Sequence, residues 1–166
     1  MDFSKAFDKV PHSQLCEKLA FYGIRGPLLT WIRNFLSNRT QCVVLNGQSS
    51  QSSNVLSGVP QGTVLGPLLF LCYINDLPND VTSRVKLYAD DVLLYSSINT
   101  IVDCQTLRED LDRLMQWADR WQMNFNSTKC ETIRITNRIN PVYYTYKMKD
   151  YCLNEVSHVK YLGGVY

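Results

Sequence analysis

Two adjacent carboxylates stand between two short apolar stretches, and no other feature constrains the fold of this chain as strongly. Residues 85–89 and 92–95 have the pattern of strands, and Asp90 and Asp91 lie where they meet. A tight hairpin would favour Asn-Gly or Asp-Gly at such a bend. Neighbouring like charges repel, so a divalent cation is the simplest partner that would make the pair favourable. Taken alone, the pair fits an ordinary polar turn equally well.

Two other segments carry weaker signals of the same kind. Residues 1–8 place Asp2 beside apolar and small residues, a position where an aspartate is more often a helix cap than a metal ligand. Residues 57–67 form a glycine-interrupted loop before an apolar stretch. Glycines let a backbone approach a ligand closely, and a helix N-terminus favours phosphate, although a purely structural loop is the simpler interpretation.

The composition predicts one compact domain. Of the 166 residues, 45% are hydrophobic and 19% are charged, and the net charge of +2 is too small to indicate nucleic-acid binding by itself. The longest apolar run, residues 68–74, is far shorter than the ~20 residues of a membrane-spanning helix, and no signal-peptide pattern opens the chain. We therefore expect an intracellular protein with no membrane partner, in the cytoplasm or the nucleus.

The cysteines indicate neither a metal site nor a disulfide framework. All six are more than twenty residues apart in the sequence, no Cys-x-x-Cys pair occurs, and the chain has only two histidines. Several lie among apolar neighbours. We expect these thiols to fill the core.

Hydrophobic periodicity predicts helices interspersed with hairpins. Helical spacing appears at residues 13–22, 27–36, 66–77 and 101–121. Strand patterns appear at residues 41–45 and around Val55, on either side of an Asn46-Gly47 turn, and again at residues 85–95, 132–135 and 142–146. This order favours an α+β domain, in which helices pack on one face of an antiparallel sheet and the other face stays free for a ligand.

Together and in this order, three strings resemble the palm motifs of reverse transcriptases. They are residues 2–7, Pro60-Gln61-Gly62 and Tyr88-Ala89-Asp90-Asp91. Fuller strings at residues 2–8, 62–67 and 73–77 are similar to those of jockey-like, non-LTR retrotransposons. Residues 121–131 resemble the family's next motif, and residues 159–164 resemble its primer-gripping hairpin. The resemblance implies that residues 1–166 are a partial reverse transcriptase domain, a palm through the primer-grip-like hairpin without fingers or thumb.

The resemblance implies an RNA-directed DNA polymerase, which adds deoxynucleotides to a DNA 3′ end on an RNA template. Asp2, Asp90 and Asp91 would hold two magnesium ions, or manganese in their place, for phosphoryl transfer. Lys129 would protonate or neutralise the departing pyrophosphate. The parent polyprotein would supply the missing fingers and thumb, and an endonuclease.

The resemblance also implies substrate and primer contacts. Phe7 would lie under the sugar of the incoming nucleotide and exclude a 2′-hydroxyl, and Gln61 would touch the nascent base pair. Two further substrate contacts would be Gly62 and Tyr88. The primer would be gripped by Tyr161, Leu162, Gly163 and Gly164.

Two alternatives remain beside this hypothesis. An RNA-directed RNA polymerase uses a related palm, but Phe7 and the sequence at residues 88–91 argue against it. A catalytically dead retrotransposon remnant could bind nucleic acid or protein, although its three carboxylates are intact. Because Asp2 is the second residue, we expect no strand to anchor it and no activity from this chain alone.

Overall fold

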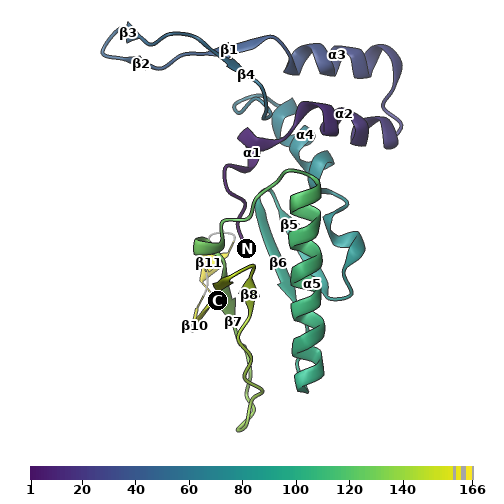
Figure 1. The fold of residues 1–166 in the computed structure, drawn as a ribbon, viewed down its shortest axis with the longest axis vertical. Helices are drawn as coiled ribbons and strands as arrows, with labels where there is room; N and C mark the ends of the chain where they lie inside the picture. The colour runs from purple at the N-terminus through teal and green to yellow at the C-terminus, as the bar shows by residue number, and fades with distance from the viewer. Residues whose placement is uncertain (159, 162–163, 166) are drawn as a thin grey trace. The chain divides into compact units, whose positions relative to one another are not determined.

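The computed structural model describes residues 1–158, 160–161 and 164–165, and the chain divides into two compact units (Figure 1). One unit, here called the helical unit, is Lys5–Asn75. The other joins Met1–Ser4 to Asp76–Tyr166 and contains the paired aspartates, so it is called the carboxylate unit. The first four residues therefore belong with the C-terminal half of the chain.

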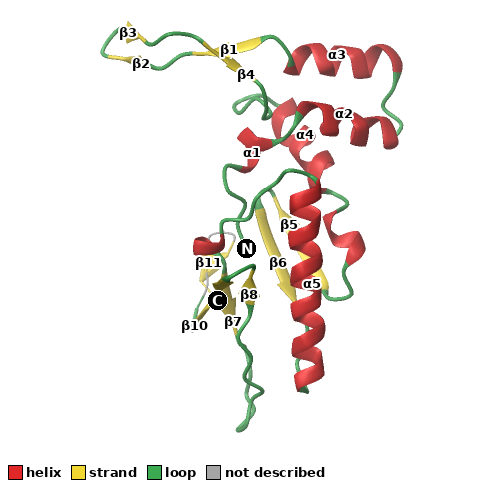
Figure 2. Ribbon diagram, viewed as in Figure 1, coloured by secondary structure: helices red, strands yellow, loops and turns green. Residues whose placement is uncertain are grey.

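The helical unit contains four helices and two small antiparallel ladders. The helices are α1 (Ala6–Lys9), α2 (His12–Phe21), α3 (Gly26–Leu36) and α4 (Leu65–Ile74). Strand β1 (Arg39–Gln41) pairs with β4 (Ser53–Val55), and β2 (Val44–Leu45) pairs with β3 (Gln48–Ser49). Figure 2 shows these strands as one long hairpin that projects from the end of α3.

Helices α2 and α4 form the core of the helical unit. Leu15 and Leu19, four residues apart on α2, are fully buried, as are Phe70 and Tyr73 of α4. The ammonium of Lys18 is buried with them, where it donates to the carbonyl oxygen of Tyr73 at 2.6 Å and lies 4.8 Å from the centroid of the tyrosine ring. A buried lysine is tolerated here because its charge meets a carbonyl and an aromatic face.

The carboxylate unit is built around one hairpin and one long helix. Its main elements are η1 (Leu77–Asp80), β5 (Arg84–Tyr88), β6 (Asp91–Tyr95), α5 (Ile101–Arg120) and η2 (Ser127–Lys129). Shorter strands follow: β7 (Glu131–Ile133), β8 (Lys147–Met148), β9 (Tyr151–Cys152), β10 (Asn154–Val156), β11 (Lys160–Tyr161) and β12 (Gly164–Val165). Strands β5 and β6 are antiparallel, with Tyr88 opposite Asp91.

Helix α5 begins at a capping box. The Thr100 backbone N–H donates to the carboxylate of Asp103 at 2.8 Å, and the Asp103 N–H donates to the Thr100 hydroxyl at 3.4 Å. Further along, Leu111 and Leu114 face the core. The helix also buries the carboxylate of Asp110, to which the backbone N–H groups of Thr82 and Ser83 donate.

The α+β class and all four long helices expected from the sequence are confirmed. The single antiparallel sheet is not observed. In the described residues the strands form six two-stranded ladders, and one of these, β7 with β10, is parallel. Ladders this short do not join into one continuous sheet, because each of the named strands in the described residues pairs with only one other named strand.

The prediction of a strand at residues 142–146 is wrong. That segment forms no strand: the Tyr146 carbonyl oxygen accepts from the Leu153 N–H at 2.9 Å, and the aromatic side chains pack locally. The Tyr144 and Tyr146 ring centroids lie 5.0 Å apart, and the guanidinium of Arg134 lies 4.1 Å from the Tyr143 ring centroid. Alternating aromatic residues are typical of a strand. Here their side chains pack locally, and no partner strand in the described residues lies beside them.

Half of the cysteines fill the core as expected. Cys16, Cys104 and Cys130 are buried, whereas Cys42 and Cys152 are exposed, and none forms a disulfide within the described residues. None of the helices in the described part of the chain has the length and apolar character that crossing a membrane requires.

Candidate functional site

Asp2 lies against the edge of β6. It forms an isolated antiparallel bridge with Asp91, the first residue of that strand. The carbonyl oxygen of Met1 accepts from the Val92 N–H at 3.0 Å, and the nitrogen of Met1 donates to the Val92 carbonyl oxygen at 2.8 Å. Two distant parts of the sequence are thus held together by backbone hydrogen bonds, which do not depend on the aspartate side chains.

A second segment holds Asp2 from the other side. The Asn126 N–H donates to the carbonyl oxygen of Asp2 at 2.8 Å, and the Ser4 N–H donates to the carbonyl oxygen of Asn124 at 2.7 Å. Phe3 bridges Phe125 between these two bonds. Residues 1–4 therefore run between β6 and residues 124–126, and the expectation that Asp2 lacks an anchor is wrong.

Phe3 fixes this arrangement through its side chain. It is only 2% exposed, and its ring stacks on the ring of Phe125 with centroids 4.3 Å apart. The Trp117 ring of α5 lies 6.4 Å from it, centroid to centroid. Buried aromatic pairs of this kind contribute about 0.5–1.5 kcal/mol beyond their area burial, so they hold a chain end firmly.

The carboxylates at this position are crowded. Burial raises the pKa of Asp91, and the charge of Asp90 raises it further; the Met1 ammonium opposes this and Asp2 adds to it. Ala89, just before the pair, has a left-handed backbone with φ of 50°, which completes the tight turn between β5 and β6. The charges are close enough to repel, and a bound cation would relieve that repulsion.

The Lys129 ammonium lies 3.5 Å from a carboxylate oxygen of Asp2. It reaches this position from η2, three residues after the Asn126 N–H that holds the Asp2 backbone. Tyr88, at the end of β5 opposite Asp91, is 62% exposed. Sequence positions 2, 88, 90, 91 and 129 therefore converge within one unit.

The donor chemistry suits a hard cation, but the ligands are not gathered into a finished site. Carboxylate oxygens are the ligands that magnesium prefers. Within the described residues, however, no group of three or more histidine, cysteine, aspartate or glutamate side chains is positioned to hold a metal ion. In this structure the lysine contact neutralises part of the charge on Asp2 instead.

The helical unit brings together two of the remaining predicted residues. The carbonyl oxygen of Phe7 accepts from the Val59 N–H at 2.7 Å, so the loop that contains Gln61 packs on the segment that contains Phe7. The Gln61 amide donates to the carboxylate of Asp8 at 3.1 Å. The Phe7 ring stacks on that of Phe70, with centroids 4.5 Å apart, and is only half-buried.

The glycines of this loop have different roles. Gly62 has a φ of +78° and open space around its α-carbon, whereas Gly58 has a φ of +89° and leaves no space for a side chain. A β-carbon added at position 58 would lie 2.8 Å from the α-carbon of Asp8. Gly58 thus permits the close approach of the two chain segments, a role that sequence reasoning did not assign.

The expected primer hairpin lies at the C-terminal end of the described chain. Tyr161 of β11 pairs with Gly164 of β12 in an antiparallel ladder. Leu162 and Gly163 lie outside the described residues.

The chain matches the model of the family described as "Reverse transcriptase (RNA-dependent DNA polymerase)" over residues 1–165. It belongs to the reverse transcriptase family. The match covers both the convergent carboxylates and the loop at Gln61. The family membership predicted from the motifs is therefore confirmed.

Curated relatives of this reverse transcriptase chain come from mobile elements. It is 32% identical over 147 residues to the "RNA-directed DNA polymerase from mobile element jockey" of Drosophila melanogaster, which covers 83% of the chain and 16% of the relative. With the Drosophila funebris jockey protein the identity is 31%, over 99% of the chain and 19% of the relative. With the "Probable RNA-directed DNA polymerase from transposon X-element" of Drosophila melanogaster the identity is 32%, over 98% of the chain and 18% of the relative.

These relatives confirm the predicted similarity to jockey-like elements. The chain spans less than a fifth of the length of each of these relatives. Sequence reasoning missed Phe3, Phe125 and Asn126, which hold Asp2 in place. An apolar residue beside Asp2 and another before Lys129 were visible, but nothing in the sequence indicated that they pair.

Proposed function

We propose that this chain carries the catalytic centre of an RNA-directed DNA polymerase, which adds deoxynucleotides to a DNA 3′ end on an RNA template. One observation carries the proposal: Asp2 lies opposite Asp91, the sequence neighbour of Asp90, and the Lys129 ammonium lies 3.5 Å from the Asp2 carboxylate. Membership of the reverse transcriptase family supports it. By the same argument, residues 1–166 are the palm of the polymerase, through the primer-grip-like hairpin.

The carboxylates would hold the catalytic ions. Asp2, Asp90 and Asp91 offer only oxygen donors, which suits magnesium, with manganese as an alternative. Two bound ions of this type would orient the attacking hydroxyl and neutralise charge on the phosphates. Lys129 is 67% exposed, so its ammonium is free to leave Asp2 and stabilise the departing pyrophosphate.

Substrate selection would depend on the helical unit. The Phe7 ring is backed by Phe70 and cannot retreat easily, so it would exclude a 2′-hydroxyl by steric contact. Gln61 would contact the nascent base pair, and Gly62 and the exposed ring of Tyr88 would contact the substrate. The RNA template, DNA primer and deoxynucleoside triphosphates are the proposed partners, and residues 161–164 would grip the primer.

The remaining regions would come from a longer parent protein. Fingers, thumb and an endonuclease are proposed from the small share of each relative that the chain spans. We keep an intracellular location as part of the proposal.

The test is primer extension on an RNA template by a protein of the length of the relatives, with this chain at the matching position. Asp91→Asn should abolish extension and leave the fold intact, because the lost charge weakens the hold on an ion. Asp112→Asn, at a partly exposed α5 carboxylate that pairs with Arg108, is the control and should extend normally. Normal extension by the Asp91 variant would refute the proposed site.

The same assay separates an enzyme from a remnant. A catalytically dead protein would fold and bind RNA, yet show no extension that depends on Asp91 or Asp90. Incorporation of deoxynucleotides that disappears in Asp90→Asn and in Asp91→Asn would exclude that alternative.

A further inference from the structure

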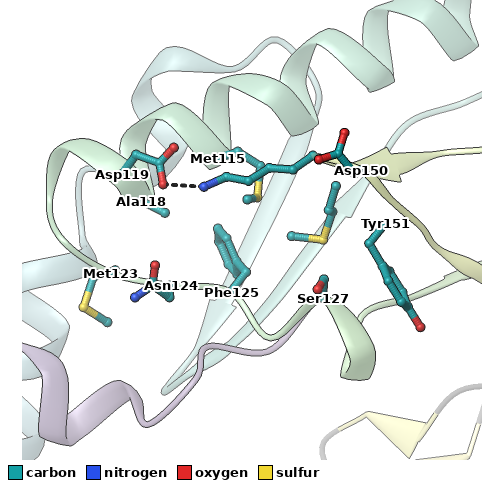
Figure 3. A pocket seen from close by; sticks show the side chains of 11 residues that line it. Met115, Ala118, Asp119, Met123, Asn124, Phe125, Ser127, Asp150 and Tyr151 are labelled. Atoms are coloured by element: carbon teal, nitrogen blue, oxygen red, sulfur yellow. Dashed lines mark hydrogen bonds and ion pairs between the residues drawn. The ribbon is translucent and has the colours of Figure 1, made fainter.

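The carboxylate unit contains a cavity of about 250 Å³ that is not lined by Asp2, Asp90 or Asp91. It lies among the last turn of α5, residues 123–127 and the turn between β8 and β9 (Figure 3). The side chains that line it are Met115, Ala118, Asp119, Met123, Asn124, Phe125, Ser127, Met148, Lys149, Asp150 and Tyr151.

The lining is unusual for this chain. Three of its four methionines line this one cavity: Met115 is partly exposed, whereas Met123 and Met148 are buried in the wall behind it. Figure 3 shows Phe125 standing between the methionine side chains. Thioethers are flexible and polarisable, and they pack well against aromatic rings, so a methionine-lined cavity adapts to flat apolar molecules.

A polar pair lies at the rim of the cavity. The Lys149 ammonium contacts the Asp119 carboxylate at 2.9 Å, and both side chains are more than half exposed. An exposed ion pair contributes little to stability, so an incoming molecule can displace it at small cost. The freed carboxylate would then accept a hydrogen bond.

We propose that this cavity binds a small, planar aromatic molecule of one fused ring system that carries a ring N–H. The volume sets the size, because about 250 Å³ lies below the roughly 300–1,000 Å³ of drug-sized ligand sites. The side chains of Met115, Phe125 and Tyr151 contact the ring faces and edges. Asp119 accepts the ring N–H.

Occupation of the cavity acts on the catalytic carboxylates through a shared wall. Phe125 lines the cavity and also stacks on Phe3. The neighbouring Asn126 N–H holds the carbonyl oxygen of Asp2 at 2.8 Å. A ligand that shifts Phe125 therefore shifts Asp2, and by linkage an ion at Asp2 changes the affinity for the ligand. Only this catalytic consequence rests on the proposed function.

The methionines themselves provide the measurement. In the whole chain labelled with methyl-¹³C methionine, Met115, Met123 and Met148 report on the cavity, and Met1 reports on the carboxylates. Titration with indole should shift the three cavity signals in a saturable manner, with a Kd on the order of 1 mM or tighter. Single Met→Leu variants, which conserve volume, assign the signals.

Two matched variants test the location of the site. Ser127→Phe places a ring in the cavity from its wall and should remove the saturable shifts. Thr128→Phe alters the next residue, which is exposed and does not line the cavity, and should leave them unchanged. Dispersed methyl signals in both variants show that they are folded.

The outcomes are distinguishable. Cavity signals that stay fixed, or that drift linearly without saturation, would overturn the binding site whether or not the protein is a polymerase. Saturation of the cavity signals with Met1 unmoved would overturn the link to Asp2. Normal primer extension by the Asp91→Asn protein in the assay above would refute the proposed function and leave the cavity result standing.

Discussion

The ring of Phe3 stacks on the ring of Phe125 with centroids 4.3 Å apart and planes inclined by 15°. Phe125→Ala should lower the free energy of unfolding by about 3 kcal/mol, because it leaves a cavity beside a buried ring. In a protein of full length, Phe125→Ala should also lower primer extension, since Asp2 loses its support. Asp112→Asn should leave extension unchanged. Unfolding in urea and extension on an RNA template measure the two effects. Phe125→Leu, which keeps most of the volume, should restore much of both.

Asp110 makes stability depend on acid pH. Its side chain is buried, and burial would raise its pKa, but hydrogen bonds from the Ser83 and Thr82 side chains and backbones outweigh this and lower the pKa to about 2. The ordinary value is 3.8, so the ionised form is favoured by folding. Its stabilisation is complete above about pH 4 and is lost as the pH falls through about 2.

Asp110→Asn should therefore lower the free energy of unfolding at pH 7 by about 2 kcal/mol, and the difference from the wild type should shrink as the pH approaches 2. Urea unfolding at several pH values between 7 and 2 measures it. Asp119→Asn, at an exposed carboxylate of the same helix, should show no such trend. A constant difference across the range would contradict the assignment.

Gly66 is required by close packing. A β-carbon at this position, in the first turn of α4, would lie 2.1 Å from the carbonyl oxygen of Pro60. Gly66→Ala should therefore lower the free energy of unfolding by about 3 kcal/mol, because the backbone must move. Gly62→Ala is the comparison. Its added β-carbon would meet only open space, so the substitution should cost only the left-handed backbone strain of about 1 kcal/mol. Equal costs in thermal unfolding would refute the steric explanation.

Phe7 should govern the choice of sugar. In a protein of full length, Phe7→Val should raise ribonucleotide incorporation relative to deoxynucleotide incorporation by about tenfold or more, because the exclusion is steric. Competition between the two nucleotides in primer extension measures the ratio. Phe21→Val, at a ring that is 85% exposed, should leave the ratio unchanged. An unaltered ratio in the Phe7 variant would make Phe7 a packing residue only.

Residues 1–166 alone should show no measurable template-directed synthesis with magnesium and deoxynucleotides, and should bind primer-template weakly. Poor anchoring of Asp2 is not the cause, because β6 and residues 124–126 hold its backbone. The cause would be that the fingers, proposed above to come from the longer parent protein, do not position the triphosphate, and lost positioning costs on the order of 10²-fold or more in rate. If the isolated chain extends a primer and Asp90→Asn abolishes that extension, the prediction of no synthesis is disproved.

The sequence alone determined the local elements and the family. Helices α2, α3, α4 and α5 follow from apolar spacing, and the β2–β3 turn follows from Asn46-Gly47, because these signals lie within a few neighbouring residues. The order of the motifs identified the reverse transcriptase family without any tertiary information.

Only the tertiary structure decided which distant segments pair. Nothing in one sequence specifies that residues 1–4 lie between β6 and residues 124–126, or that β7 pairs in parallel with β10. Backbone hydrogen-bonding groups are the same for nearly every residue type, so they do not specify which segment pairs with a strand edge. The partner is chosen by burial of side chains such as Phe3 and Phe125, which becomes definite only when the whole unit is packed.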